Sequence, residues 1–410
     1  MNSTPWRNEQ WYTSHWNFNP ELTKSYKFAD KVQFRDVSLR DGEQQPGLLF
    51  NKDQKVEIAE KLAAVGIHSI EAGMPLVSRQ DEEAIREIVK RKFGPSIYSF
   101  ARCLAQDAEL AQDMGCDGVI MEIAGNKELL QYGYQWDRQR AVDAAVTATS
   151  AAHERDLDVV LFLIDTARAD FDFLIGFIDE VNRDGHFDAL TCVDTYGVLN
   201  PFAAYHIIGV LKEKYPDKRI EIHCHNDFGM GAAATVMGLA AGADVAHTTI
   251  SGIGERAGNV AYEDVAFTLL ALFGVDTGLK WDLLYPTSRF IHELAGIECR
   301  ANEGIIGPSI NKMAAGLPIG WYEKVKSVDP LILLPYRWTF TGHPDVEYCI
   351  GKHSGGPVIK HYLKKLGLPD DDEDKNTEIL NNVKDAAYNK GTTLTVEEFQ
   401  KIAEAIITKA

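Results

Sequence analysis

The chain has 410 residues, of which 45% are hydrophobic and 25% are charged. These are ordinary values for a globular protein with a buried core. Lysine and arginine number 42 against 60 aspartates and glutamates, so the formal net charge is −18 at pH 7. Such a surface repels phosphate backbones and anionic lipids, which disfavours nucleic-acid and membrane partners. The N-terminus lacks the apolar core of a signal peptide, and we expect a cytoplasmic protein.

Eight short β-rich runs alternate with helical patterns along the chain. We predict strands near residues 32–39, 68–73, 96–102, 118–124, 158–164, 189–194, 219–225 and 244–250. Stretches with helical periodicity, such as KDQKVEIAEKLAAVG and FAAYHIIGVLKEKY, separate them. This alternation predicts an α/β fold, a parallel (β/α)8 TIM barrel over residues 30–282. An open doubly wound sheet is the alternative, but its glycine-rich fingerprint is absent after the first strand.

The predicted barrel has two flanking regions. Residues 1–29 are an N-terminal extension, and residues 283–410 are a smaller, mainly helical C-terminal region. The acidic run DDDEDK at 370–375 indicates a solvated linker, and an amphipathic helix begins near residue 395.

Polar residues gather where the predicted strands end. A TIM barrel carries its active site at the C-terminal ends of its strands, so this clustering indicates an enzyme. The residues at these ends are Arg40, Asp41, Glu43, Gln44, Glu71, Arg102, Asp194, Thr195, His223, His225 and Asn259.

A metal site is predicted at the same rim. His223 and His225 are two residues apart on strand seven, so both side chains leave the same face. An isolated pair of this kind is more often structural, but Asp41 and Asn259 follow strands one and eight. Two imidazoles and two oxygen ligands, with room for water or substrate, suit Mg²⁺, Mn²⁺ or Zn²⁺ acting as a Lewis acid.

Three runs resemble the Claisen-condensing enzymes of the DRE-TIM metallolyase superfamily, which include isopropylmalate, homocitrate and citramalate synthases. They are LRDGEQQPG (39–47), HCHNDFG (223–229) and GIGERAGN (252–259). The resemblance covers about residues 30–280, and GKHSGG (351–356) is similar to the synthases' linker region. It implies that Asp41, His223, His225 and Asn259 hold the metal. It also implies that Arg40 polarises a ketone oxygen.

The GIGERAGN form of the last loop implies condensation of acetyl-CoA, or a similar acyl-CoA, with a 2-oxo acid to give a 2-hydroxy diacid. A retro-Claisen lyase or aldolase acting on a 3-hydroxyacyl-CoA or hydroxy acid is the alternative. A metal-binding but catalytically silent protein is a third hypothesis. The family resemblance also implies a homodimer.

Condensation requires a general base to remove a proton beside the thioester. Glu71 and Glu43 are the candidates, although each could instead anchor Arg40 or another cation. Thr195 resembles the family position that bonds the substrate carboxylate, and Gln44 is a further substrate-binding candidate. Arg102 would pair with a substrate acid or form an internal ion pair.

The chain departs from the synthase pattern in two places. The histidines of the family's AHxxGIH-like segment are missing from residues 301–307, and Tyr336 and His343 are candidate catalytic replacements, each with a structural role as the alternative. After strand four, an inward Glu122 would suit a polar or charged 2-oxo acid, but a one-residue shift in register would turn it outward.

Overall fold

The computed structural model describes residues 4–408, which belong to two compact units. Of the described residues, 16–298 form one unit, and 4–15 with 299–408 form the other. The boundaries differ from those expected, because the first unit continues past residue 282 through α10 (Leu284–Ala295). Among residues 4–408, none of the helices combines the length and apolarity needed to cross a membrane.

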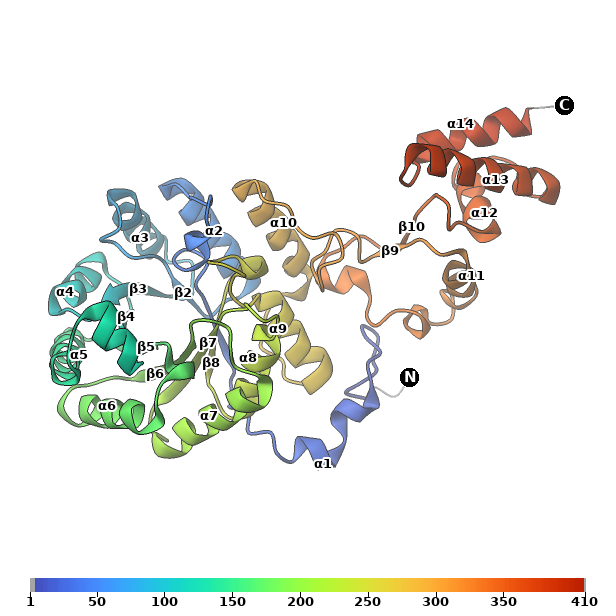
Figure 1. The fold of residues 1–410 in the computed structure, drawn as a ribbon. Coiled ribbons are helices and arrows are strands. Elements are labelled where there is room, and N and C mark those ends of the chain that lie inside the picture. Colours follow the sequence, from blue (N-terminus) through green and yellow to red (C-terminus); the bar gives the residue numbers. More distant parts are fainter. Residues whose placement is uncertain (1–3, 409–410) are drawn as a thin grey trace. The chain divides into compact units, whose positions relative to one another are not determined.

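The larger unit contains a closed barrel of eight parallel strands, which confirms the predicted fold class (Figure 1). Each strand pairs with the next along the chain, and β1 closes the barrel against β8. The strands are β1 (Gln33–Asp36), β2 (Ser69–Glu71), β3 (Ser96–Arg102), β4 (Gly118–Ala124), β5 (Asp158–Ile164), β6 (Ala189–Asp194), β7 (Arg219–Cys224) and β8 (Val245–Thr248).

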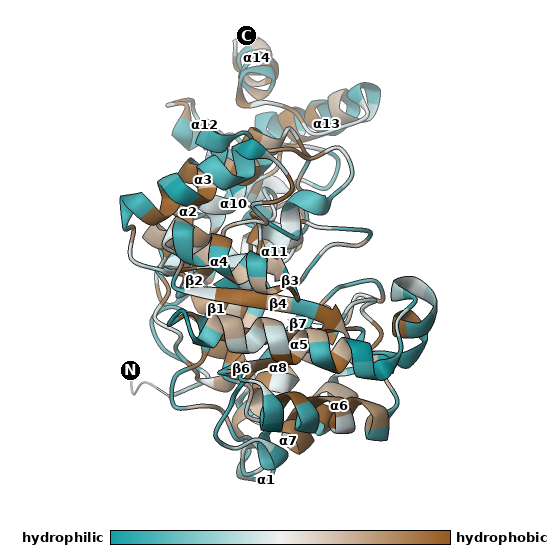
Figure 2. Cartoon of the chain, turned by 90° about the vertical axis from the view of Figure 1, so that its left-hand side faces the viewer, coloured by the Kyte–Doolittle hydropathy of each residue, from teal (hydrophilic) through white to brown (hydrophobic). Residues whose placement is uncertain are grey.

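Helices follow the strands and surround the barrel (Figure 1). They are α2 (Lys52–Val65), α3 (Arg79–Arg91), α4 (Ala105–Met114), α5 (Arg138–His153), α6 (Phe171–Asp184), α7 (Pro201–Lys214), α8 (Gly231–Ala240) and α9 (Tyr262–Thr268). A short helix, α1 (Pro20–Thr23), precedes the barrel. Hydrophilic and hydrophobic positions alternate along helices such as α2, α3 and α6 (Figure 2). In α6, the buried residues Leu174, Phe177, Ile178 and Val181 form one helical stripe that packs inward.

Alternate residues of the central strands fill the barrel interior. Tyr98 and Phe100 of β3, Ile120 of β4, and Val160 and Phe162 of β5 form one buried cluster. Because side chains alternate along a strand, the next residues of the same parity point toward the barrel mouth. Interior packing therefore determines which polar residues enter the candidate site.

A buried ionic network, which the sequence analysis does not anticipate, also lies inside the barrel. Glu221 of β7 accepts hydrogen bonds from Arg35 of β1 (2.9 Å) and Arg219 (2.9 Å), and lies 2.6 Å from the His247 imidazole. The Arg35 guanidinium also lies 3.7 Å from the centre of the Tyr98 ring. Glu221, Arg35 and His247 are fully buried or nearly so, so their charges depend on one another.

The smaller unit is mainly helical, as expected. Its helices are α11 (Gly316–Val325), α12 (Gly356–Lys365), α13 (Glu373–Lys390) and α14 (Val396–Ile407), and its two strands, β9 (Lys312–Met313) and β10 (Glu347–Tyr348), pair in parallel. Its core includes Ile319, Val358, Ile379 and Phe399. The acidic run is a linker only in part, because Asp372 caps α13 and the following residues begin that helix.

The N-terminal extension does not behave as one segment. Residues 4–15 belong to the smaller unit and residues 16–29 to the larger one. The link to the smaller unit is a backbone bridge between Trp11 and Tyr336, supported by an ion pair between Arg7 and Asp329 at 2.8 Å. The aromatic residues near the N-terminus therefore pack in part within the chain.

Candidate functional site

Arg40 and Asp41 follow β1 directly and lie at the barrel mouth. Arg40 donates through Nε to Oε1 of Glu71, which ends β2, and its Nη1 lies 3.0 Å from Oδ2 of Asp41. The face of Phe100 lies 4.0 Å from the Arg40 guanidinium carbon. Glu71 is fully buried. The structure therefore gives Glu71 the anchoring contact that was one of its two predicted roles.

Three predicted metal ligands lie together. Nε2 of His223 is 3.3 Å from Oδ2 of Asp41, and Nε2 of His225 is 3.5 Å from the same oxygen. One possible ligand atom from each residue lies within 4.8 Å of the others, and all three residues are buried. Both Nε2 atoms thus face a carboxylate oxygen, an arrangement that a divalent cation could occupy.

Asn259 joins this group through a loop rather than a strand. It forms a backbone bridge with His225, and its Nδ2 donates to the carbonyl of Ile253 at 3.2 Å. Its Oδ1 is buried and has no hydrogen-bond partner among the described residues. An orphaned amide oxygen beside two imidazoles and a carboxylate fits a divalent cation that accepts nitrogen and oxygen ligands.

The loop after β8 needs its glycines for steric reasons. Gly252, Gly254 and Gly258 have φ values of 70°, 144° and 82°, where a side chain is strained. A Cβ at Gly258 would overlap the carbonyl oxygen of Gly252. Arg256 holds the loop against its neighbours by binding Asp227 (2.9 Å) and the carbonyl of Thr195 (2.6 Å).

The local electrostatics favour the ionised carboxylate and the neutral imidazole. Burial alone would raise the pKa of Asp41, but Arg40 and the hydrogen bonds to His223 and His225 lower it well below its ordinary value. Burial lowers the pKa of His223 to about 3, against the raising effect of Asp41. These are the protonation states in which both residues can bind a metal ion.

The other predicted rim residues have different environments. Glu43 accepts from the backbone N–H of Phe50 at 2.7 Å and pairs with Lys55 at 2.5 Å, so it anchors the loop after β1. Lys55 is buried and also binds Asp81. Lys55 has no signal in the sequence, because a lysine on an amphipathic helix normally points to solvent.

Arg102 and Thr195 also have partners within the chain. Arg102 forms a two-pronged ion pair with Asp107, with both nitrogen–oxygen distances at 3.0 Å, which is its internal-ion-pair alternative. Thr195 Oγ1 accepts the backbone N–H of Asp165 at 2.9 Å, which leaves its hydroxyl proton free for another acceptor.

Tyr336 and His343 belong to the smaller unit. His343 is 3% exposed. Its Nδ1 lies 3.2 Å from Thr341 Oγ1, and its Nε2 lies 3.2 Å from the carbonyl oxygen of Gly307. Tyr336 packs edge-on against Trp338 at 4.6 Å between ring centres. These contacts support the structure of the unit, and catalytic roles for both residues stay predictions.

A cavity of about 730 Å³ opens beside Arg40 at the ends of β1 to β4. Its walls include Gln44, Phe100, Met74 and Glu122. Glu122 shares the parity of the interior residue Ile120, so it faces inward as the substrate-binding prediction requires. Tyr134, which the sequence analysis did not single out, donates its hydroxyl to Glu122 at 3.2 Å.

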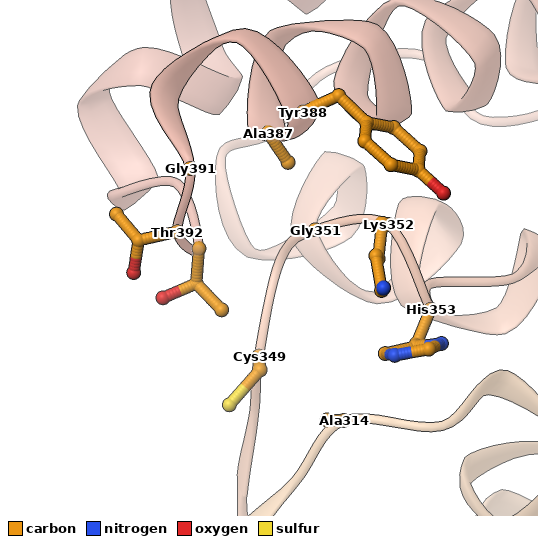
Figure 3. A pocket seen from close by; sticks show the side chains of 10 residues that line it. Ala314, Cys349, Gly351, Lys352, His353, Ala387, Tyr388, Gly391 and Thr392 are labelled. Carbon is orange, nitrogen blue, oxygen red and sulfur yellow. The ribbon is translucent and has the colours of Figure 1, made fainter.

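A second hollow, of about 380 Å³, lies within the smaller unit. Figure 3 shows Cys349, Lys352 and His353 on one loop facing the end of α13 and the turn after it, where Tyr388, Gly391 and Thr392 lie. The GKHSGG run thus forms one wall of a pocket.

Comparison with known proteins gives the family. Residues 31–291 match the HMGL-like family. The chain belongs to the HMGL-like family, within the DRE-TIM superfamily. This confirms the resemblance carried by the three motifs, and the matched range contains every residue of the candidate metal site.

Curated relatives of this HMGL-like chain extend the similarity beyond the barrel. A 2-isopropylmalate synthase from Methanocaldococcus jannaschii is 32% identical over 391 residues, covering 94% of this chain and 74% of the relative. The homocitrate synthase AksA from Methanothermobacter thermautotrophicus is 30% identical over 399 residues, covering 97% and 98%.

Among solved structures, the hydroxymethylglutaryl-CoA lyase from Bacillus subtilis matches with a TM-score of 0.60 and 19% identity. It covers 67% of this chain and 97% of the lyase. At this identity the likeness concerns the fold alone.

Proposed function

We propose that this HMGL-like protein is a divalent-metal-dependent synthase that condenses acetyl-CoA, or a similar acyl-CoA, with a 2-oxo acid. Water then hydrolyses the thioester of the condensed product, which gives a 2-hydroxy diacid and CoA. The observation that carries the proposal is the convergence of Asp41, His223, His225 and Asn259 beside Arg40 at the barrel mouth. The names of the isopropylmalate and homocitrate synthase relatives support it.

Asp41, His223, His225 and Asn259 would hold the metal. When bound, a divalent ion supplies a Lewis acid that polarises the ketone of a 2-oxo acid. Arg40 can donate a hydrogen bond to the same ketone oxygen through Nη2, which is buried and has no hydrogen-bond partner among residues 4–408. A fixed donor of this kind stabilises charge that develops on an oxygen during attack.

The two candidates for the general base differ in the contacts of their carboxylate oxygens. Both carboxylate oxygens of Glu43 are occupied, one by the Phe50 N–H and one by Lys55. In Glu71, Oε1 binds Arg40, whereas Oε2 is buried without a partner in the described part of the chain. We therefore assign the base to Glu71, and the free hydroxyl proton of Thr195 to the substrate carboxylate.

The test measures CoA release from acetyl-CoA with Mg²⁺ or Mn²⁺ across pyruvate, 2-oxoisovalerate, 2-oxoglutarate and oxaloacetate. Asp41→Ala and His223→Ala should each lower turnover by at least about 100-fold, because they remove metal ligands. The matched control is His206→Ala, which changes an exposed histidine on α7 and should leave turnover unchanged.

Three results would contradict the proposal. Full activity in Asp41→Ala would mean that the metal site is misassigned. Cleavage of a hydroxyacyl-CoA without any condensation would favour the retro-Claisen alternative. Binding of metal and 2-oxo acid without turnover of any substrate would favour a catalytically silent protein.

A further inference from the structure

Glu122 is a carboxylate in the wall of the cavity that forms no ion pair with a described residue. Within the described part of the chain, its one hydrogen bond comes from the Tyr134 hydroxyl at 3.2 Å, and it forms no ion pair there. Burial raises the pKa of Glu122, against the lowering effects of Arg40 and of the Tyr134 hydrogen bond. Burying a carboxylate in this position destabilises the folded protein unless a further hydrogen-bond donor contacts it.

The other charged residues that line the cavity are already paired. Glu43 and Asp81 both pair with Lys55. Arg79 pairs with Glu83 at 2.7 Å on the surface of α3. Arg40 is engaged by Glu71 and Asp41. Of the carboxylates that line this wall, Glu43, Asp81 and Glu122, Glu122 is therefore the one without an ion pair among residues 4–408.

The position of Glu122 relates it to the reacting end of a substrate. Arg40 connects the candidate metal site with the cavity. It contacts Asp41 of the metal site, and it also lines the cavity together with Glu122. A 2-oxo acid whose ketone lies at Arg40 can extend its side chain along Phe100 and Met74 toward Glu122. Those two residues provide apolar walls for methylene groups, and Glu122 provides the polar end.

We propose that the cavity binds the side chain of a 2-oxo acid that ends in a hydrogen-bond donor, a hydroxyl or an ammonium, placed against Glu122. Glu122 is the specificity-determining residue, and Tyr134 is a positioning residue that holds its carboxylate. This inference rests on the proposed function for the presence of a 2-oxo acid. The identity of the side chain rests on the cavity alone.

The charge balance supports a donor rather than an acid. When ionised, Asp41, Glu71 and Glu122 place three negative charges around the Arg40 guanidinium, on which all three act electrostatically. A divalent cation neutralises the excess, and the carboxylate of a 2-oxo acid adds one further negative charge. A second substrate carboxylate next to Glu122 would add repulsion, whereas a branched apolar side chain would bury Glu122 without a new partner.

The experiment is calorimetric binding to the Mg²⁺-loaded full chain without acyl-CoA. Three probes of similar length differ at one end, 4-hydroxy-2-oxobutanoate with a hydroxyl, 2-oxopentanoate with a methyl, and 2-oxoglutarate with a carboxylate. We expect the hydroxyl compound to bind at least about tenfold more tightly than the methyl compound. Tighter binding of the methyl compound, or of 2-oxoglutarate, overturns the inference.

Variants assign the preference to the cavity. Glu122→Leu should abolish the hydroxyl preference, and Glu122→Gln, which keeps the shape, should reduce it if the leucine variant does not fold. Tyr134→Phe should reduce the preference by less. The matched control Glu128→Leu, at an exposed glutamate beyond the same strand, should leave it unchanged. A preference that survives in both Glu122 variants overturns the inference.

Failure of this inference can be distinguished from failure of the proposed function. A Glu122-dependent hydroxyl preference without CoA release would remove the synthase proposal alone. CoA release with equal use of the methyl and hydroxyl compounds would remove the side-chain inference alone. If none of the three probes binds, the side-chain inference is wrong, and the synthase proposal is still decided by CoA release with the four 2-oxo acids named above.

Discussion

Glu221→Gln removes the negative charge at the centre of the buried network inside the barrel. The wild-type carboxylate is fully buried and has three polar neighbours, Arg35, Arg219 and His247, at 2.9, 2.9 and 2.6 Å. Glutamine keeps one oxygen acceptor but leaves the Arg35 guanidinium without its counter-charge. Two further nitrogens of Arg35, Nε and Nη1, already lack hydrogen-bond partners among the described residues.

The expected loss of stability is large because neither water nor another carboxylate can replace the missing charge. Breaking a buried ion pair by removing one partner costs about 3–5 kcal/mol. The conservative replacement argues for the lower end, about 3 kcal/mol. An unfolding entropy of roughly 2.1 cal/mol/K per residue makes about 0.6 kcal/mol/K for residues 16–298, so the Tm of this unit should fall by about 5 °C.

The assay is thermal unfolding of the full chain followed by circular dichroism. Arg35→Met with Glu221→Gln should recover most of the lost stability, because the double variant no longer buries an unpaired arginine. Glu57→Gln, at an exposed position of α2, is the control and should unfold at the wild-type temperature. A Glu221→Gln variant as stable as the wild type, or a double variant less stable than Glu221→Gln, would refute the reasoning.

Two further predictions concern other parts of the chain. Gly254→Ala should weaken Mn²⁺ binding by at least about tenfold in calorimetry, because a Cβ there would overlap the amide nitrogen of Asn259. Gly47→Ala is the control, since its φ is also positive but its Cβ would meet nothing within 4 Å; equal affinities in the two variants would contradict the prediction. Burial lowers the pKa of His343 to about 4, so below about pH 6.5 the unfolded chain binds a proton that the folded chain does not. The smaller unit should therefore lose stability as the pH falls from 6.5 toward 4, and His343→Gln should show a smaller fall in Tm between pH 7 and pH 5; an unchanged fall would assign the acid sensitivity elsewhere.

The barrel was predictable because each strand and helix has its own periodic signal. The predicted strands at 96–102, 118–124, 158–164 and 189–194 coincide with β3, β4, β5 and β6. Prediction was less accurate at the ends of the chain. Residues 4–15 join the smaller unit through the bridge from Trp11 to Tyr336, and no periodic pattern indicates such a contact between distant segments.

In the candidate site too, some features could be predicted from the sequence and others could not. The pairing of His223 with His225 follows from the alternation of side chains along a strand, and the barrel topology brings Asp41 to the same rim. The sequence could not decide whether Glu122 points inward, because a shift of one residue reverses every side chain of β4. It also gave no sign that Tyr134 would reach Glu122 from the segment that follows the strand.

The sequence by itself determined the fold class, the family and the residue types gathered at the barrel mouth, because these depend on local periodicity and on motifs a few residues long. Only the tertiary structure decided which charges are already paired. Lys55 forms an ion pair with Glu43, and Asp107 forms one with Arg102. Glu71, beside Arg40, has one carboxylate oxygen without a hydrogen-bond partner among the described residues. Ion pairs of this kind join residues from separate strands and helices, so their partners are set by packing rather than by spacing along the chain.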